Sequence, residues 1–161
     1  MPVFEEILSR IQSDLSDSLL KSELYRGETT FYIKKQDIVS VCKKLKSDFG
    51  FNYLADVLGT DRFTDEDRFE VIYHLRNLTE AWFLRLVVLV DEKDLAVDTV
   101  SSVWKTANWE EREVFDMYGI KFNHHPDLRR MYMPQDFEYF PLRKEFPLIG
   151  IEGSIPLPAK E

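Results

Sequence analysis

The sequence is poor in the residues that bridge chains or hold metal clusters. Of its 161 residues, one is cysteine, Cys42, and three are histidine. A single cysteine cannot form a disulfide within the chain, and it cannot hold an iron–sulfur cluster alone, because such clusters are usually bound by four protein ligands. A reducing compartment is the simpler interpretation of this cysteine content.

Glycine is also scarce, and its six residues do not cluster. The sequence contains no Gly-x-Gly-x-x-Gly fingerprint, no Walker lysine loop and no Gly-x-Ser-x-Gly nucleophile elbow, so the common nucleotide-binding and hydrolase sites are not predicted. Cys42 falls on the apolar face of a predicted helix, which favours a place in the core over a role as a nucleophile. We expect no catalytic residue, no cofactor-binding residue and no metal ligand in this chain.

Positive charge and long apolar runs are lacking as well. The net charge is −8, which argues against binding to nucleic acid or to an anionic membrane surface, since both need a positive face. The longest apolar run, Leu86–Val90, is far shorter than the roughly 20 residues that span a bilayer. Glu5 and Glu6 stand where a signal peptide carries positive charge. We therefore expect a soluble protein that meets a membrane only through a partner.

The first half of the chain has clear periodicity, and its length and 44% hydrophobic content suit one globular domain. Apolar residues spaced by three and four predict two helices, the second ended by Gly50, and the runs on either side of Arg26-Gly27 predict a hairpin between them. The predicted segments are a helix over 3–15, a hairpin of 19–25 and 29–33, and a helix over 38–49.

Three strands are predicted next, over 51–58, 69–78 and 82–90. The last of them, Trp82–Val90, is nearly all apolar, as expected of a central strand that is covered on both faces. The segment Gly59–Arg68 between the first two strands carries six charged residues, and we predict that it is a solvated loop.

A further helix is predicted after Asn108, which is placed to cap it. Glu111 follows three residues later, as a capping box requires, and Gly119 is placed to end the helix. Arg112 and Asp116 are four residues apart, which predicts an ion pair on the helix surface.

Two interpretations of the acidic residues on this helix stay open. They form either a solvated face or an interface stripe in which Glu111 and Glu113 meet arginines of a partner. An autonomous enzyme built on these carboxylates is disfavoured, because no nucleophile, base or phosphate-binding loop accompanies them.

From Ile120 onward no helical or alternating pattern remains, and residues 124–161 contain six prolines. The segment is nevertheless rich in aromatic side chains, unlike a disordered linker. Three explanations stay open: the segment lies on a partner, it packs on its own domain, or it is disordered. We divide the chain into a core domain, residues 1–122, and an extended C-terminal tail, residues 123–161, which we expect to bind a partner.

The run His124-His125-Pro126-Asp127 raises the question of a metal site. Adjacent histidines in an extended segment point to opposite sides, and the third histidine, His74, is on a distant predicted strand. A His-Pro turn with Asp127 in local hydrogen bonds is therefore the favoured interpretation.

Two basic pairs, Arg129-Arg130 and Arg143-Lys144, interrupt an acidic chain. Residues 121–148 carry five Lys/Arg and four Asp/Glu, whereas residues 1–120 have a net charge of −8. The pairs either fold the tail back onto the acidic body or anchor it to another subunit through bidentate contacts with carboxylates, and both interpretations stay open.

Three blocks in this region carry a resemblance to a known family. They are Glu111-Arg112-Glu113-x-x-Asp116-x-x-Gly119-Ile120-x-Phe122, then His125-Pro126-Asp127-Leu128-Arg129-Arg130, then Pro141-Leu142-Arg143-Lys144-Glu145-Phe146-Pro147-Leu148. In order and spacing they resemble the signature of the C-type subunit (the 30 kDa subunit family) of NADH:quinone oxidoreductase, which is respiratory complex I. The sequence departs from that signature at Tyr139, where the family has a glycine, and at Glu145, where Asp is commoner.

The resemblance implies an α+β domain with a mostly antiparallel sheet, flanking helices and a long extended C-terminal tail. It implies that the tail lies along the quinone-site subunit (D type), with neighbouring iron–sulfur subunits as further partners. It also implies a peripheral place at the cytoplasmic face of the cell inner membrane, in the standalone form of the subunit. FMN, iron–sulfur clusters and quinone are then expected in partner subunits, and no cofactor in this chain.

On the same grounds, we expect a non-catalytic structural subunit that supports electron transfer from NADH to quinone in a proton-translocating complex. The alternative is the equivalent subunit of a related ferredoxin-driven quinone oxidoreductase or membrane-bound hydrogenase complex. The residues expected to bind the partners are Glu111, Arg112, Glu113, Asp116, His125, Asp127, Arg129, Arg130, Pro141, Leu142, Arg143, Lys144 and Phe146.

Overall fold

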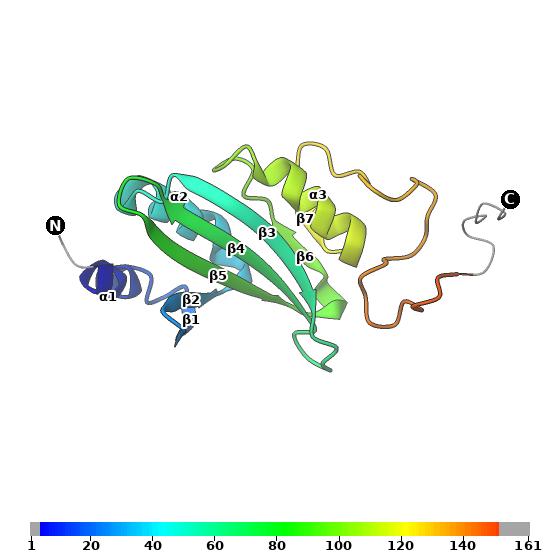
Figure 1. The fold of residues 1–161 in the computed structure, drawn as a ribbon, viewed down its shortest axis with the longest axis horizontal. Coiled ribbons are helices and arrows are strands. Elements are labelled where there is room, and N and C mark those ends of the chain that lie inside the picture. The colour runs from blue at the N-terminus through cyan, green and yellow to red at the C-terminus, as the bar shows by residue number, and fades with distance from the viewer. Residues whose placement is uncertain (1–3, 152–161) are drawn as a thin grey trace, which may run out of the picture.

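The structure is a computed structural model that describes residues 4–151, and it confirms the α+β class (Figure 1). Two single turns of 3-10 helix, η1 (Lys35–Asp37) and η2 (Glu92–Asp94), join the larger elements. In chain order these are α1 (Phe4–Asp14), β1 (Leu19–Tyr25), β2 (Glu28–Ile33), α2 (Ile38–Phe49), β3 (Tyr53–Asp61), β4 (Phe69–Asn77), β5 (Trp82–Val90), β6 (Ala96–Asp98), α3 (Ala107–Tyr118) and β7 (Lys121–Asn123).

Five strands form one mixed sheet in the order β1-β2-β5-β4-β3. Neighbouring strands are antiparallel except β2 and β5, which run parallel with Thr30 opposite Arg85. The expected mostly antiparallel sheet is therefore confirmed. The parallel pair can form because α2 and the β3–β4 hairpin lie between its strands in the chain, which supplies the long crossover that parallel pairing requires.

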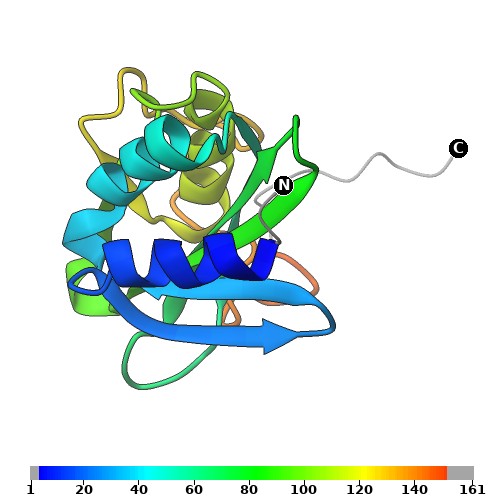
Figure 2. The same ribbon diagram turned by 90° about the vertical axis from the view of Figure 1, so that its left-hand side faces the viewer.

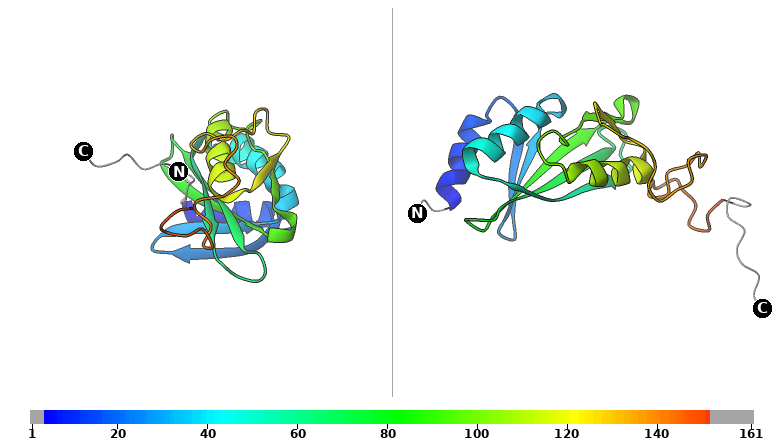
Figure 3. Two further views of the ribbon diagram at one scale, coloured as in Figure 1. Left: turned by 90° about the vertical axis from the view of Figure 1, so that its right-hand side faces the viewer. Right: turned by 90° about the horizontal axis from the view of Figure 1, so that it is seen from above.

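The three helices lie on one side of the sheet (Figure 3, right), where α1 runs beside β1 and β2 (Figure 2). Strand β5 is central, and its inward residues Leu84 and Leu86 are fully buried. The prediction that Trp82–Val90 is covered on both faces is only partly right for the second face. Val87 is buried there, but Phe83 and Leu89 are only half-buried, because no helix among the described residues covers that side.

Glycine ends the elements where the sequence predicted it. Gly50 and Gly119 take left-handed conformations, with φ of 69° and 78°, and their N–H groups donate to carbonyl oxygens in the last turns of α2 and α3. Arg26 and Gly27 also have positive φ, and they form the tight turn between β1 and β2. These three predicted boundaries are confirmed, because a left-handed turn closes the chain at each of them.

The predicted solvated loop over Gly59–Arg68 is wrong at both ends. Strand β3 continues to Asp61, and Asp61 and Arg68 are only 4% and 8% exposed. They are buried because they pair with each other: Arg68 Nη2 lies 2.8 Å from Asp61 Oδ2. Only the segment between them is solvated.

A second sheet was not predicted. Strands β6 and β7 pair in parallel, with Val97 opposite Phe122, and both of these side chains are buried. Each strand has three residues, which is too short for alternation to be visible in the sequence. Because β7 follows directly after α3, it fixes the point at which the C-terminal segment leaves the domain.

Gly59 marks the closest approach of β3 to α3. A Cβ atom at this position would lie 2.5 Å from Cδ2 of Tyr118 and 3.1 Å from Cγ1 of Val114. Overpacking of this kind costs about 1–3 kcal/mol. We expect Gly59→Ala to lower the free energy of unfolding by that amount, measured by urea denaturation.

The control is a double-mutant cycle with Tyr118→Leu, which removes the ring that the new methyl group would meet. The loss in the double variant should be clearly smaller than the sum of the two single losses. Additive losses would show that the contact between Gly59 and Tyr118 is not the reason for the glycine.

Candidate protein-docking surface

We call residues 124–151 the strap. The strap contains no helix or strand, leaves the domain beside α3 and returns toward the end of β3 (Figure 1). A segment that forms no helix or strand must find other hydrogen-bond acceptors for its backbone N–H groups. In this molecule, two buried carboxylates of the domain accept hydrogen bonds from several N–H groups of the strap.

Asp116 of α3 is the first anchor of the strap, and its side chain is fully buried. Its Oδ1 accepts from Nη1 of Arg130 at 2.7 Å. Its Oδ2 accepts three successive backbone N–H groups, those of Met131 at 2.9 Å, Tyr132 at 2.6 Å and Met133 at 3.0 Å. Burial would raise the pKa of Asp116, but these hydrogen bonds outweigh it and the pKa is lowered.

Asp61 at the end of β3 is the second anchor. Arg68 binds it with a two-pronged contact, Nε to Oδ1 at 3.0 Å and Nη2 to Oδ2 at 2.8 Å. The backbone N–H groups of Phe63 and Lys144 complete its shell at 2.9 and 2.8 Å. Burial works against the charge, yet the bonds from Arg68, Lys144 and Phe63 lower the pKa of Asp61 to about 2. Glu145 of the strap also pairs with Arg68.

Arg143 lies between these two anchors and fills the space beside Gly119. Its Nε donates to the carbonyl oxygen of Tyr118 at 2.7 Å, and its guanidinium carbon lies 4.6 Å from the ring centre of Phe140 and 5.2 Å from that of Phe69. A Cβ atom on Gly119 would come within 2.7 Å of the Phe140 ring. This arginine of the strap therefore faces its own domain.

Many of the strap's large apolar side chains face the other way. The rings of Phe137, Tyr139 and Phe146 form a cluster with centre distances between 5.6 and 6.3 Å. Phe137 and Phe146 are half-buried in this cluster and Tyr139 is exposed, and exposed apolar side chains gathered in one segment are typical of a protein-interaction surface. The backbone at Tyr139 is not left-handed, so the departure from the family's glycine causes no strain there. The exposed apolar side chains are Tyr132, Tyr139, Leu142, Leu148 and Ile149.

Glu111 has an internal role. Helix α3 begins at Ala107 with no side-chain cap, so the predicted capping box is wrong. The fully buried carboxylate of Glu111 instead accepts the hydroxyl of Thr99 and, at 2.8 Å, the N–H of Val100. Burial raises its pKa to about 7 in spite of these bonds. Contact of this carboxylate with a partner would require breaking them.

The predicted His-Pro turn is confirmed. The N–H of Asp127 donates to Nδ1 of His125 at 3.0 Å, and Nε2 of His125 lies 3.0 Å from the carbonyl oxygen of Asn108. Asp127 also accepts from Nε of Arg129 at 2.9 Å. Within residues 4–151 no group of three His, Cys, Asp or Glu side chains is arranged to hold a metal. That the chain binds no metal stays a prediction.

Arg112 is buried, and the predicted ion pair with Asp116 is wrong because Asp116 binds Arg130 instead. Nε of Arg112 donates to the carbonyl oxygen of Arg129 at 3.1 Å, and its guanidinium lies over the ring of Trp109.

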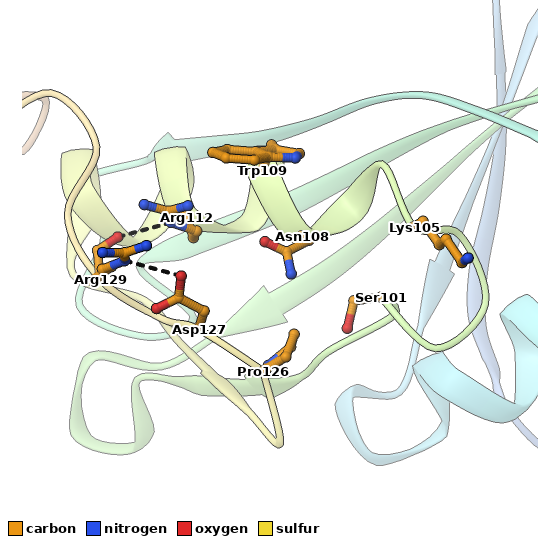
Figure 4. Close-up of a pocket in the computed structure, with 8 residues that line it drawn as sticks. All are labelled: Ser101, Lys105, Asn108, Trp109, Arg112, Pro126, Asp127 and Arg129. Carbon is orange, nitrogen blue, oxygen red and sulfur yellow. Dashed lines mark hydrogen bonds and ion pairs between the residues drawn. The ribbon is translucent and has the colours of Figure 1, made fainter.

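A pocket of about 530 Å³ opens beside Arg112 (Figure 4). The residues that line this pocket are Ser101, Lys105, Asn108, Trp109, Arg112, Pro126, Asp127 and Arg129.

Half-buried Glu110 points from α3 toward β3. Burial raises its pKa to about 7, and the nearby charges of Asp56 and Glu113 add to that shift. Its Oε2 has no hydrogen-bond partner among the described residues.

The thirteen residues predicted to bind a partner divide by position. Glu111, Arg112 and Asp116 are buried in this chain, and binding of a partner by any of the thirteen stays a prediction. Sequence reasoning missed Asp61 and Arg68, although the alternation of β3 places Asp61 on the inward face. The exposed members of the set are Glu113, Asp127, Arg129, Leu142 and Lys144.

Comparison with known proteins shows to which class of protein this chain belongs. A family model described as "Respiratory-chain NADH dehydrogenase, 30 Kd subunit" matches residues 31–152. The C subunit of NADH-quinone oxidoreductase from Geotalea uraniireducens (strain Rf4) is 41% identical over 141 residues, which are 88% of this chain and 86% of the relative. The chain thus has the character of a subunit of a respiratory oxidoreductase complex. It belongs to the 30 kDa subunit family of NADH dehydrogenase, the family of these C subunits, as its three blocks predicted.

Further relatives agree with this. The C subunit from Geobacter metallireducens (strain ATCC 53774 / DSM 7210 / GS-15) is 43% identical over 142 residues, 88% of each chain. A solved structure described as the trypsin-resistant fragment (1-134) of Nqo5 has a TM-score of 0.67 and 31% identity, and covers 78% of this chain and 98% of that one. The partners of this chain are accordingly other subunits of such a complex.

The fold is shared more widely than the sequence. A chain of the membrane-bound sulfane sulfur reductase, described as an archaeal respiratory membrane complex, has a TM-score of 0.76 at 20% identity over 90% of this chain and 86% of that chain. In this chain, none of the helices in the described part is long and apolar enough to cross a membrane.

We expect Asp116→Asn to release the first half of the strap. The amide oxygen can accept fewer and weaker bonds than the carboxylate, and Arg130 would be left buried without its charge partner. Breaking a buried pair in this way costs about 3–5 kcal/mol. Amide hydrogen exchange at Met131–Met133 and cleavage by trypsin after Arg129 and Arg130 should both accelerate.

The matched control is Asp136→Asn, the same change at an exposed position of the strap. It should leave hydrogen exchange and trypsin cleavage as they are in the parent chain. Equal behaviour of the two variants would show that Asp116 does not hold the strap.

Docking of the strap should fail in acid. The pKa of Asp61 is lowered to about 2 and that of Asp116 is lowered as well. Groups with a depressed pKa stabilise the folded form above the ordinary carboxyl pKa of about 3.8–3.9, and this stability is lost as the pH falls through the folded value. Protection of the amide of Lys144 should persist at pH 4 and 5 and disappear near pH 2, and that of Tyr132 should also persist at pH 4 and 5 and be lost in stronger acid.

The amides of β5 in the same samples provide the internal reference. If the amides of the strap stay protected near pH 2 as long as those of β5 do, the two carboxylates are not what holds the strap.

Proposed function

We propose that the chain is a non-catalytic structural subunit that docks, through its strap, onto the quinone-site subunit (D type) of an NADH:quinone oxidoreductase. The observation that carries this proposal is that the strap has two different sides. Its anchoring groups face its own domain, whereas many of its rings and leucines face outward. Binding to such a strap costs less conformational entropy than binding to a free segment, because its backbone is already placed.

The choice of partner rests on the block Pro141–Leu148, which resembles the family's signature. The exposed side chains of Leu148 and Ile149 stand at the end of this block, and both are fully exposed in the chain alone. Exposed leucine and isoleucine at adjacent positions favour a partner groove over solvent. The C subunits among the relatives come from complexes whose names include NADH and quinone.

A division into a stable domain and an attached segment is supported by the related Nqo5 fragment, which is described as trypsin-resistant. That fragment covers 78% of this chain. Among residues 4–151 the last helix or strand ends at Asn123, so a stable domain of similar extent would leave much of the strap as the attached part.

The redox chemistry of the complex, in this proposal, resides in other subunits. FMN, iron–sulfur clusters and quinone would be held by the D-type and iron–sulfur subunits, and this chain would align them at the cytoplasmic face of the membrane. In support, Cys42 is buried in the core, and burial raises the pKa of its thiol far above the usual range, so it is a poor ligand or nucleophile.

A second candidate is the equivalent subunit in a complex with a different electron donor. It is favoured by the fold that this chain shares with a chain of the sulfane sulfur reductase complex. Because that likeness concerns the fold alone, the NADH-driven complex is preferred. Finding the flavin-containing NADH-binding subunit in the purified complex would decide between them.

The docking proposal predicts the effect of changing Leu148 and Ile149 together to serine. Both side chains are exposed in the isolated chain, so its free energy of unfolding should change by no more than about 0.5 kcal/mol. Burial of each side chain at an interface is worth about 1.5–3 kcal/mol, so attachment to the quinone-site subunit should weaken at least about 100-fold. Co-purification with a tagged quinone-site subunit measures this.

Leu24→Ser is the control, since Leu24 is an exposed leucine on edge strand β1, away from the strap. It should co-purify as the parent chain does. If the strap variant is retained as well as Leu24→Ser, the strap does not dock the subunit.

A further inference from the structure

Arg112 is a buried cation without a carboxylate of its own. It is 6% exposed, and among residues 4–151 its contacts are the carbonyl oxygen of Arg129 at 3.1 Å and the ring of Trp109 at 4.9 Å. Buried Arg68 and half-buried Arg130 each pair with an aspartate. The guanidinium of Arg112 lines an open pocket, and no carboxylate among residues 4–151 pairs with it, so an anion in that pocket would meet an unpaired positive charge.

The pocket beside Arg112 is positively charged on an acidic chain. Three cations line it, Lys105, Arg112 and Arg129, and its one carboxylate, Asp127, is already bound by Arg129 at 2.9 Å (Figure 4). Asn108 lines it as well, in the first turn of α3, where the helix dipole favours negative charge. Whatever fills this pocket is therefore expected to be anionic.

The walls of the pocket suit a polypeptide better than a small free anion. Trp109 is 61% exposed and offers a flat apolar surface, and Pro126 lines the pocket with it. One turn along α3, exposed Glu113 meets the hydroxyl of Tyr132 from the strap at 3.3 Å. The strap thus comes within one helical turn of the pocket, so one partner surface can cover both.

We propose that this pocket receives an aspartate or glutamate side chain from a loop of a partner subunit. The carboxylate forms a two-pronged pair with Arg112, assisted by Lys105, and the loop backbone lies against Trp109. Planar guanidinium and carboxylate groups match in this geometry. The inference rests on the docking function proposed above and adds to it a second, charged contact whose partner is acidic.

The test places a competing carboxylate in the pocket. Asn108→Asp is nearly isosteric, and an acidic residue in the first turn of a helix is well tolerated, so the isolated chain should keep its thermal midpoint. In the purified complex the new charge repels the partner's carboxylate and neutralises Arg112. Dissociation of the chain in a salt series should be at least about tenfold faster than for the parent.

Asn52→Asp is the matched control, because it makes the same charge change at an exposed position before β3, away from the pocket. It should dissociate as the parent chain does. If Asn108→Asp and Asn52→Asp dissociate at the same rate, the proposal is overturned.

A zero-length cross-link supplies a test that needs no substitution. A carbodiimide joins a lysine amine to a carboxylate that touches it, so treatment of the intact complex should link Lys105 to an aspartate or glutamate of another subunit, identified by mass spectrometry. A Lys105 linked only within its own chain, or not linked at all, would contradict the proposal.

The alternative of a free anion has its own readout. Inorganic phosphate titrated into the isolated chain would change the fluorescence of exposed Trp109, and this change should be absent in Arg112→Gln. Such binding, together with no inter-subunit link at Lys105, would assign the pocket to a free anion and overturn the proposal. If the pocket tests fail but the variant with serine at positions 148 and 149 still loses its attachment to the quinone-site subunit, the proposal for the pocket is overturned and the docking function remains supported.

Discussion

Two buried carboxylates, Asp61 and Asp116, determine how the strap is displayed. Asp116 accepts three backbone N–H groups of the strap and Asp61 accepts one, and each also binds an arginine side chain, so the path of the strap is fixed by charge-assisted hydrogen bonds. A segment held in this way has no need to bury its own apolar side chains. Many of its rings and leucines are therefore left for another surface, which is the reverse of the usual arrangement in a globular domain.

Much of the fold followed from the sequence, because its long elements have strong periodicity. The helix over 38–49, the first hairpin and the central strand lie where apolar spacing and glycine predicted them, and α3 ends where Gly119 predicted but begins at Ala107, two residues before the predicted start. The segments that were not predicted correctly were short or polar. Strands β6 and β7 have three residues each, and the charged run after Gly59 was predicted to be solvated although Asp61 and Arg68 neutralise each other inside.

Many residues of the candidate site were predicted from the sequence, but the contacts that they make were not. The blocks around Asp116, Arg130 and Arg143 were recognised, yet these groups bind their own domain first. A sequence cannot separate the two cases, because an arginine uses the same geometry for an internal carboxylate as for a partner's. His125 was the exception: its neighbours Pro126 and Asp127 predicted a local turn, and local contacts are what short motifs specify best.

The parallel pairing of β2 with β5 has a consequence for biogenesis. β2 ends at Ile33, but the strand beside it is complete only at Val90, so the N-terminal hairpin leaves the ribosome with one edge unpaired. The strap emerges later still and finds its anchors only after β3 and α3 have folded. β3 and α3 must therefore be in place before the strap can take the path that its two anchors fix.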